Sequence, residues 1–551
     1  MRPLLAALAS VLLFACSVWA AHVNVYWNVT YIDMDRTGDS LRRSITVNGA
    51  YPIPPIHVSL GDTLYIHLHN MLDVPTSIHG HGLLMNGTNY MDGAGMVTQC
   101  GIPPGESFTY KYDIVQRGTF WIHGHYDHQN SDGLRAPLIV HDERKYDGEF
   151  LFFLEDWYKQ SYHERLRLTT GPGTVFPPPA SFPHALINGF DGNKTKPIRF
   201  EKGKTYRIRL INMAITEWFK FSIAGHKLRV IEVDSEYSDP LEVDGVDIGP
   251  AQRYSVLVTA HDDDEFNFNY NVTLYASFVP VVQGMNPRYY KGLVEYKKDA
   301  PLKKVPEPKN FVWAEDLNLS SYSGQEPLPV TRQIDLSFNG SPFTNGKVLD
   351  VINNITYSEP KMPTLYSALS LGKLAFNESL YGPQTHAIVL NHMEYVELVL
   401  RNPNSLPHPI HLHGHVFQIV SSGPEELTPS LGFSETSNEN TKEPVKTYTG
   451  RVPISRDTIV IPSGRYVKIR FRADNPGAWL LHCHMDIHMG MGMVMTFIEA
   501  PDVLQKTLRI PPQMADFCRK LKIPVEGNGA GKQGFDLSGL PEPPKMGLPP
   551  S

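Results

Sequence analysis

The sequence is short of cysteine, of charged residues and of long apolar runs. Only four of the 551 residues are cysteine, against 23 histidines, so the chemistry is to be sought among the histidines. Charged residues make up 19% and hydrophobic residues 41%, which argues against a disordered chain or a highly charged interaction tail. The net charge of −7 argues against nucleic acid as the natural partner.

Long apolar runs are missing after the first twenty residues, so no membrane anchor is visible in the sequence. Residues 1–20 are predicted to be a secretory signal, with Arg2 at its start and an apolar stretch over Leu4–Val18. An uncleaved anchor is the alternative. The C-terminal residues 541–551 are proline-rich and polar. We therefore expect a secreted protein, either extracellular or in the cell wall.

Eight N-x-S/T sequons agree with secretion and predict a glycoprotein, although each one alone is a weak signal. The candidate acceptors are Asn28, Asn86, Asn193, Asn271, Asn318, Asn339, Asn354 and Asn377.

Glycine and proline are plentiful, with 43 and 45 residues spread along the chain, which fits many turns between short strands. One strand-like pattern of alternating apolar and polar residues occurs three times, at 61–70, 203–212 and, more loosely, 393–402. A second strand-like segment follows each copy. The repeats predict an all-β protein of three sandwiches or barrels. The predicted boundaries are 1–20 for the signal, 21–145 and 146–303 for the first two domains, and 304–551 for the third domain with its tail.

The histidines follow the repeat, because the first and third copies each carry two H-x-H pairs and the middle copy carries none. Alternate side chains of a strand point to the same face, so both imidazoles of a pair can reach one site. Imidazole suits copper, zinc, iron and nickel. The pairs are His79 and His81, His123 and His125, His411 and His413, and His482 and His484.

A cysteine between two of these histidines indicates the metal. Cys483, with His408 and His488, forms a His₂Cys set, which is the ligand arrangement of electron-transfer copper, and Met493 could fill a weak axial position. We therefore predict one mononuclear copper site and one cluster on the eight paired histidines. Zinc is the competing metal, but structural zinc sites do not need eight histidines in matched pairs.

The other cysteines raise the question of a disulfide. Removal of the signal removes Cys16 and leaves three cysteines in an oxidising compartment. If Cys483 binds metal, Cys100 and Cys518 are left to pair; two unlinked thiols are the alternative.

These four histidine motifs, with Cys483 among them, resemble those of the multicopper oxidases, in both order and spacing. The resemblance implies three cupredoxin-like domains and four copper ions. It implies a type 1 copper at His408, Cys483 and His488, and a type 2 copper at His79 and His411. It implies a type 3 pair on His81, His123, His125, His413, His482 and His484. It also supports the Cys100–Cys518 disulfide.

The resemblance further implies four one-electron oxidations of a small reducing substrate, coupled to reduction of O₂ to water. Asp92 and Asp486 match positions where relatives carry acids near the cluster, and a carboxylate there can relay protons. The alternative is that both are ordinary turn residues.

The substrate depends on which branch the chain resembles, fungal laccases or fungal iron-oxidising enzymes. Iron oxidases of this branch carry acids around type 1, because Fe(II) binds oxygen anions. Here the first such position is Asn404, and the stretches 177–184 and 274–283 contain no acid. Glu217 lies near the segment where laccases carry a proton-accepting carboxylate. We therefore expect a laccase-like oxidase of phenols or polyphenols, with pigment or secondary-metabolite precursors among the candidates. The alternatives are an Fe(II) oxidase of an iron-uptake system and a non-catalytic copper-binding protein.

Met493 departs from typical fungal laccases, which have a non-ligating side chain at the axial position. A weak thioether ligand stabilises Cu(II), so we expect a lowered type 1 potential and a preference for easily oxidised substrates. Core packing by a methionine-rich run is the alternative.

Overall fold

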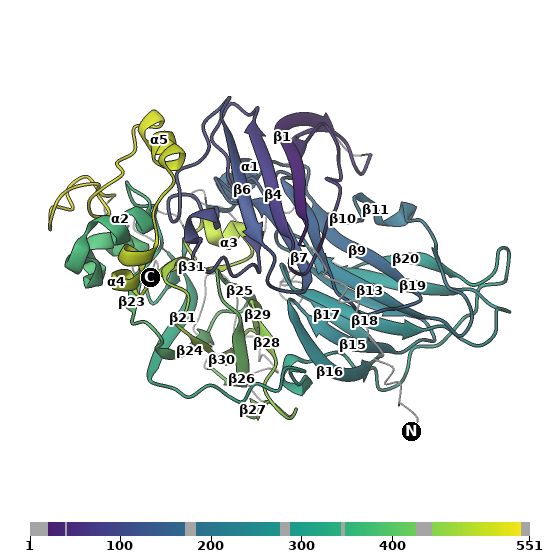
Figure 1. The fold of residues 1–551 in the computed structure, drawn as a ribbon. Coiled ribbons are helices and arrows are strands. Elements are labelled where there is room, and N and C mark those ends of the chain that lie inside the picture. The colour runs from purple at the N-terminus through teal and green to yellow at the C-terminus, as the bar shows by residue number, and fades with distance from the viewer. Residues whose placement is uncertain are drawn as a thin grey trace, which may run out of the picture.

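The computed structural model describes residues 20–38, 41–170, 183–275, 287–342, 348–425 and 443–541. Nearly all of the predicted signal, most of residues 541–551 and most of the two acid-free stretches at 177–184 and 274–283 lie outside these residues. Within them the chain forms β-strands with a few short helices, as predicted. The strands make three successive cupredoxin-like sandwiches, each of two sheets (Figure 1).

The first sandwich joins a sheet of order β2-β1-β4-β6 to a sheet of order β3-β8-β7-β5, and side chains from both sheets share one apolar core. Its strands are β1 (His22–Met34), β2 (Arg42–Val47), β3 (Ile56–Ser59), β4 (Thr63–Asn70), β5 (Ile78–His81), β6 (Ser107–Asp113), β7 (Gly118–Gly124) and β8 (Arg135–His141), with one 3₁₀ turn, η1 (Asn89–Met91).

The second sandwich joins seven strands, in the order β11-β10-β9-β13-β18-β15-β16, to five in the order β12-β20-β19-β14-β17. Its elements are β9 (Gly148–Trp157), α1 (Tyr162–Thr170), β10 (His184–Ile187), β11 (Phe190–Asp191), η2 (Gly192–Lys194), β12 (Ile198–Arg199), β13 (Thr205–Asn212), β14 (Trp218–Ile223), β15 (Leu228–Val233), β16 (Glu236–Val243), β17 (Gly245–Ile248), β18 (Arg253–Thr259), β19 (Phe268–Tyr275) and β20 (Arg288–Glu295).

The third sandwich joins a sheet of order β22-β21-β24-β30-β26-β27, with β28 paired to β26, to a sheet of order β23-β32-β31-β25-β29. Its strands are β21 (Arg332–Pro342), β22 (Val348–Ile352), β23 (Ala387–Leu390), β24 (Tyr395–Asn402), β25 (His408–Leu412), β26 (Phe417–Pro424), β27 (Lys446–Thr447), β28 (Ser455–Arg456), β29 (Thr458–Ile461), β30 (Arg465–Arg472), β31 (Gly477–Cys483) and β32 (Val494–Glu499). Its helices are η3 (Asp316–Asn318), α2 (Thr364–Ser370), η4 (Gly372–Phe376), η5 (Glu378–Tyr381), η6 (Pro383–Thr385), α3 (Asp486–Gly490), α4 (Pro501–Thr507) and α5 (Pro512–Lys520).

The repeated sequence pattern corresponds to the same strand in each sandwich. β4, β13 and β24 are the three copies, and each pairs in parallel with the first strand of its sandwich, β1, β9 or β21. Each also pairs antiparallel with the strand of the second predicted segment, β6, β18 or β30. Because every second side chain of β4 and β30 is buried, these strands have one core face and one outer face. The predicted boundaries at 145 and 303 fall in the connections β8–β9 and β20–β21, and they stay predictions.

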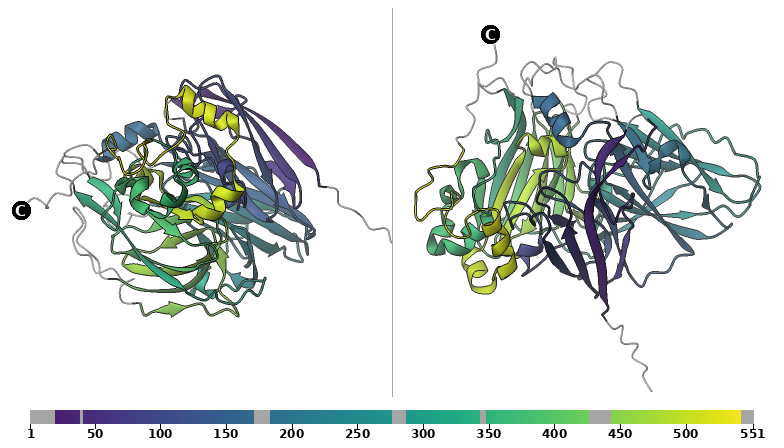
Figure 2. Two further views of the ribbon diagram at one scale, coloured as in Figure 1. Left: turned by 60° about the vertical axis from the view of Figure 1, so that its left-hand side comes forward. Right: turned by 90° about the horizontal axis from the view of Figure 1, so that it is seen from above.

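The C-terminal helix α5 returns to the first sandwich. Cys518, on α5, forms a disulfide with Cys100, 418 residues earlier, as predicted. α2, α4 and η4 lie together on the outside of the third sandwich (Figure 2). Across the described residues, no helix has both the length and the apolar character needed to cross a membrane.

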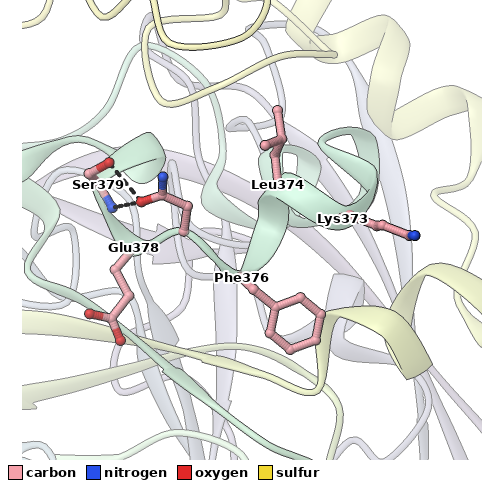
Figure 3. A pocket seen from close by; sticks show the side chains of 6 residues that line it. Lys373, Leu374, Phe376, Glu378 and Ser379 are labelled. Atoms are coloured by element: carbon pink, nitrogen blue, oxygen red, sulfur yellow. Dashed lines mark hydrogen bonds between the residues drawn. The ribbon is translucent and has the colours of Figure 1, made fainter.

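Most of the predicted glycosylation sites are at the surface. Asn28, Asn86, Asn193, Asn318, Asn354 and Asn377 are exposed, and Asn271 and Asn339 are half-buried. Asn377 lies in a surface hollow formed by η4 and η5, where its Oδ1 accepts hydrogen bonds from the amide and hydroxyl of Ser379 (Figure 3). Glycosylation at these positions stays a prediction.

Candidate metal centres

The four H-x-H pairs meet where the first and third sandwiches contact each other. β5 and β7 pair so that His79 is opposite His123. β25 and β31 pair so that His411 is opposite His482. Each domain therefore presents two pairs side by side, and the two sets face one another.

Rings from the two sandwiches stack directly. The ring centroids of His79 and His413 are 4.0 Å apart, and those of His81 and His411 are 3.7 Å apart. All eight paired histidines are buried. The group is therefore one shared cluster, and neither sandwich could form it alone.

Smaller sets within the cluster have the dimensions of metal sites. Candidate ligand atoms of His125, His413 and His482 lie within 4.8 Å of one another. Ligand atoms of His79, His411 and His413, and of His79, His81 and His123, also lie within that distance, so the sets overlap. The rings of His81, His123 and His484 lie near one another, with centroids 5.0 to 5.8 Å apart. His79 and His411 remain, with centroids 5.8 Å apart.

Backbone carbonyls hold several of the rings by one nitrogen. The Nδ1–H of His79 donates to the carbonyl of Asp92 at 2.9 Å, that of His411 to Asp457 at 2.8 Å, and that of His123 to Gly124 at 3.1 Å. The Nε2 atoms of these three rings are buried and have no partner among the described residues. A buried acceptor without a partner costs about 1–3 kcal/mol, so these nitrogens fit metal ligands better than packing groups.

Four imidazoles of the cluster are held in the protonation state that binds metal. Burial, followed by the neighbouring imidazoles, lowers the pKa of His123, His125 and His413 well below the usual value. Burial lowers the pKa of His482 to about 4. Neutral imidazole is the form that coordinates metal ions, so these rings can bind cations without first losing a proton.

Asp92 lies against two rings of the cluster. Its side chain is fully buried and accepts a hydrogen bond from Nδ1 of His413 at 3.0 Å, while its Oδ1 is 3.2 Å from Nδ1 of His79. A carboxylate in this position fixes the tautomer and orientation of a ligand histidine. The proton-relay role predicted for Asp92 stays a prediction.

Asp457 is a residue of this site that the sequence did not indicate. Its Oδ1 accepts a hydrogen bond from Nε2 of His81 at 3.1 Å, and its carboxylate also accepts two hydrogen bonds from Arg253, at 2.7 and 2.6 Å. Arg253 comes from β18, so the middle sandwich also supports the cluster although it carries no histidine pair. No local motif marks Asp457, because His81 is 376 residues away.

A second centre lies around Cys483 at the end of β31. The Sγ atom is 3.7 Å from Nδ1 of His408 and 3.7 Å from Nδ1 of His488, and the two nitrogens are 3.1 Å apart. All three side chains are buried. One thiolate and two imidazoles converging in this way match the trigonal set of electron-transfer copper.

Met493 belongs to the same buried surroundings. Its amide donates to the carbonyl of His488 at 3.0 Å, and its own carbonyl accepts from the amide of Cys483 at 3.1 Å. The loop that carries Met493 is therefore tied to two of the three candidate ligands. Its axial role stays a prediction.

A cavity of about 210 Å³ leads to the cluster and has space for a small molecule such as O₂. Its walls include His123, His125, His482 and His484, together with Asp486. The Asp486 carboxylate accepts hydrogen bonds from Ser131 at 2.5 Å and from Asn130 at 3.4 Å. Burial raises the pKa of Asp486 to about 6. Its predicted role in proton delivery stays a prediction.

Glu217 is inside the protein rather than in an open pocket. It is fully buried, and its Oε1 accepts a hydrogen bond from the Tyr158 hydroxyl at 2.7 Å. Burial, followed by the charge of Asp156, raises the pKa of Glu217 to about 8. Because such a group holds its proton at neutral pH, this geometry does not favour the predicted role of proton acceptor from a phenol, which stays a prediction.

Family models described as multicopper oxidase match residues 28–145, 148–289 and 357–503. The iron transport multicopper oxidase fetC of Epichloe festucae is 39% identical over 95% of this chain and 84% of that protein. The iron multicopper oxidase fer1 of Mycosarcoma maydis is 36% identical over 95% of this chain and 88% of its own length.

Solved structures show the same similarity. Fet3p, a multicopper oxidase that functions in iron import, superposes with a TM-score of 0.84 and 30% identity, covering 96% of this chain and all of that one. The laccase of Botrytis aclada superposes with a TM-score of 0.70 and 28% identity, covering 91% of this chain and 92% of that one.

The raised pKa of Glu217 predicts how stability depends on pH. An unfolded chain loses the Glu217 proton near its ordinary pKa of 4.5, whereas the folded protein keeps it to about pH 8. The contribution of Glu217 to the free energy of unfolding is therefore greatest below pH 4.5. As the pH rises from 4.5 towards 8, this contribution falls by up to about 1.4 kcal/mol per pH unit. Glu217→Gln removes this loss. The melting temperature of the variant minus that of the wild type should therefore be larger at pH 8 than at pH 5.

Differential scanning calorimetry at the two pH values measures this difference. Glu315→Gln, at an exposed position, is the control and should follow the wild type. An equal gap between Glu217→Gln and the wild type at both pH values would contradict the prediction.

Proposed function

Because the chain belongs to the multicopper oxidase family, we propose that it oxidises Fe(II) to Fe(III) and transfers the electrons to O₂. The protein is a copper-dependent oxidoreductase that uses O₂ as acceptor, with four copper ions: one type 1, one type 2 and two type 3. Membership of this enzyme family leaves no support for a non-catalytic copper-binding protein. The choice of Fe(II) rests on one observation, the similarity of nearly the whole chain to iron-oxidising relatives.

The family resemblance and the geometry of the two centres support the following assignment of copper ligands. We assign the type 1 copper to Cys483, His408 and His488, with Met493 in the axial position. We assign the type 2 copper to His79 and His411, and the type 3 pair to the two three-histidine sets. Those sets are His125, His413 and His482, and His81, His123 and His484.

The donor types in each centre agree with this assignment. A buried thiol with two imidazoles suits a type 1 copper. Buried imidazole nitrogens without a partner suit the copper ions of the cluster. Burial raises the pKa of the Cys483 thiol, so metal binding there must release a proton. When bound, copper supplies one-electron oxidation at type 1 and reduction of O₂ to water at the other three ions.

The protein's own groups connect the two centres, orient the rings of the cluster and border the cavity. Cys483 is bonded through the backbone to His482 and His484, so the two centres are joined by a short covalent path. Asp92 and Asp457 hold rings of the cluster in place. Asp486 borders the cavity, and its proposed role is to supply protons that are consumed when O₂ is reduced to water.

Oxidation of phenols is the second candidate and is favoured by one specific feature. Asn404 stands where iron oxidases of this branch carry an acid, and its Oδ1 accepts a hydrogen bond from the amide of Leu406 at 3.3 Å. A neutral amide binds Fe(II) more weakly than a carboxylate. The sequence alone favours phenolic substrates, whereas the comparisons favour the iron alternative.

An extracellular or cell-wall location is also part of the proposal.

Steady-state rates with two reductants separate the candidates. With the same copper-loaded sample, we expect kcat/KM to be at least about tenfold higher for Fe(II) than for a catechol, a difference of about 1.4 kcal/mol in transition-state stabilisation. Oxygen uptake measures both rates. A higher kcat/KM for the catechol would overturn the iron assignment and leave the copper assignment intact.

Removal of the Asp92 charge tests the cluster assignment. Asp92→Asn removes the negative charge and one of the two acceptor oxygens beside His413 and His79, so we expect copper affinity at the cluster to fall by about 10- to 100-fold. The type 1 blue colour should persist, because Cys483, His408 and His488 are untouched. Copper content after dialysis against a chelator, together with the absorption spectrum, measures both effects.

Asp113→Asn, an exposed change in the same sandwich, is the matched control and should retain all four ions. Full copper retention in Asp92→Asn would show that the carboxylate does not support the cluster.

A further inference from the structure

His57 and His141 form an imidazole pair on the surface of the first sandwich that the proposed function does not use. Nδ1 of His57 and Nε2 of His141 are 3.0 Å apart. The two rings stack with an interplanar angle of 14° and a centroid distance of 5.2 Å. His57 is exposed and His141 is half-buried, so an ion in solution can reach the pair.

Two neighbouring strands place these rings together. His57 lies on β3, the edge strand of its sheet, and His141 is the last residue of β8, which pairs with β3 in parallel. The register sets His57 opposite Ile139, two residues before His141, so both imidazoles lie on one face of the sheet. Val58 and Val140 point to the other face and are buried in the core of the sandwich. The backbone pairing of the strands therefore holds the two rings side by side.

The pair is separate from the proposed copper centres. Arg135, at the other end of β8, pairs with His123 of the cluster. His141 is six residues after Arg135. At about 3.3 Å per residue, the pair lies about 20 Å along the strand from the cluster. A metal ion at the pair would therefore be additional to the four proposed copper ions.

The separation of the two nitrogens is that of two ligands on one metal ion. With metal–nitrogen bonds of about 2.0–2.1 Å and angles of about 90–110°, two ligand nitrogens lie about 2.8–3.4 Å apart. The proposed copper ligands have the same spacing, with 3.1 Å between the Nδ1 atoms of His408 and His488. The Nε2 atoms of His413 and His482 are also 3.1 Å apart. The surface pair therefore has the geometry of two pairs of proposed ligands.

A hydrogen bond between the rings is the ordinary alternative. One ring can donate its N–H to the other, but water competes for both groups at an open position, so such a bond contributes little to stability. Burial lowers the pKa of His141, which keeps this ring neutral at physiological pH. Two neutral imidazoles with facing nitrogens can bind a metal ion once the shared proton moves to an outer nitrogen.

The remaining ligand positions would be open to water. Within the described residues, no further histidine, cysteine or carboxylate atom completes a three-ligand group with these rings. Glu149 is the acid whose charge acts on His141, and its carboxylate is paired with Arg209 at 3.0 Å. Two protein ligands with water suit an exchangeable ion. Nitrogen sites bind Cu(II) more tightly than Ni(II) or Zn(II), so copper is the metal expected here.

We propose that His57 and His141 form a fifth, exchangeable copper site on the surface of the first sandwich, outside the catalytic centres. Cu(II) bound there would connect the edge strand β3 to β8 on the face where Ile139 shares an apolar cluster with Phe153 and Ile211 of the second sandwich. Because the ion binds the folded arrangement of the two strands, it should stabilise the protein against unfolding. The site is independent of the choice between Fe(II) and phenols as substrate.

Equilibrium dialysis of Cu(II) against the copper-loaded, untagged full chain tests the proposal. At the same free copper concentration, the wild type should bind one more Cu(II) per chain than His57→Gln or His141→Gln, because each change removes one of the two nitrogens. We expect each variant to bind this ion at least about tenfold more weakly. Free histidine should remove the ion and leave the other four copper ions in place. The added Cu(II) should raise the melting temperature of the wild type and not that of the two variants.

His67→Gln is the matched control. His67 is a half-buried histidine on β4 of the same sandwich, and its ring nitrogens contact oxygens of Thr109 and Asn24 instead of a second imidazole. This variant should bind as many Cu(II) ions as the wild type. Equal copper binding by the wild type and His57→Gln would overturn the proposal, and so would an equal loss in His67→Gln, because surface histidines would then bind copper without a defined site. Tighter binding of Zn(II) than of Cu(II) at the pair would overturn the choice of copper.

Discussion

The contact of eight buried imidazoles across the boundary between the first and third sandwiches is the interaction on which the rest of the structure depends. Burial lowers the pKa of His123 and His413, and carbonyl oxygens hold one nitrogen of several rings of the cluster. The Nε2 atoms of His79, His123 and His411 have no partner within the described chain. An arrangement of this kind is costly for an empty protein and favourable for one that holds several cations, so metal binding and domain association are coupled.

The middle sandwich carries no histidine pair, yet it supports the cluster through charge. Arg253 on β18 binds Asp457, and Arg456 beside Asp457 binds Asp234 of the middle sandwich at 2.9 Å. These groups are fully buried, so removing one partner would leave an uncompensated charge. The third sandwich is thereby fixed to the second at the residue that also contacts His81. All three domains therefore contribute to the cluster, although only two of them supply the proposed ligands.

Local patterns in the sequence predicted much of this structure, and long-range packing supplied the rest. The strand copies β4, β13 and β24, the H-x-H pairs and the His₂Cys set could be predicted because alternation along a strand is a local property. The Cys100–Cys518 disulfide was predicted from the cysteine count and a family resemblance. Asp457 could not be predicted, because its contact with His81 depends on segments brought together only by the fold. The substrate class could not be predicted either: the lack of an acid at Asn404 is a local feature that favours phenols, whereas similarity over nearly the whole chain favours iron.

Anomalous diffraction at the copper absorption edge, on crystals of the copper-loaded protein, tests the central claim most directly. The account predicts one peak within the triangle of Cys483, His408 and His488, and three peaks among the eight paired imidazoles. Fewer than three peaks in the cluster of a fully active sample, or type 1 copper bound to other side chains, would contradict it.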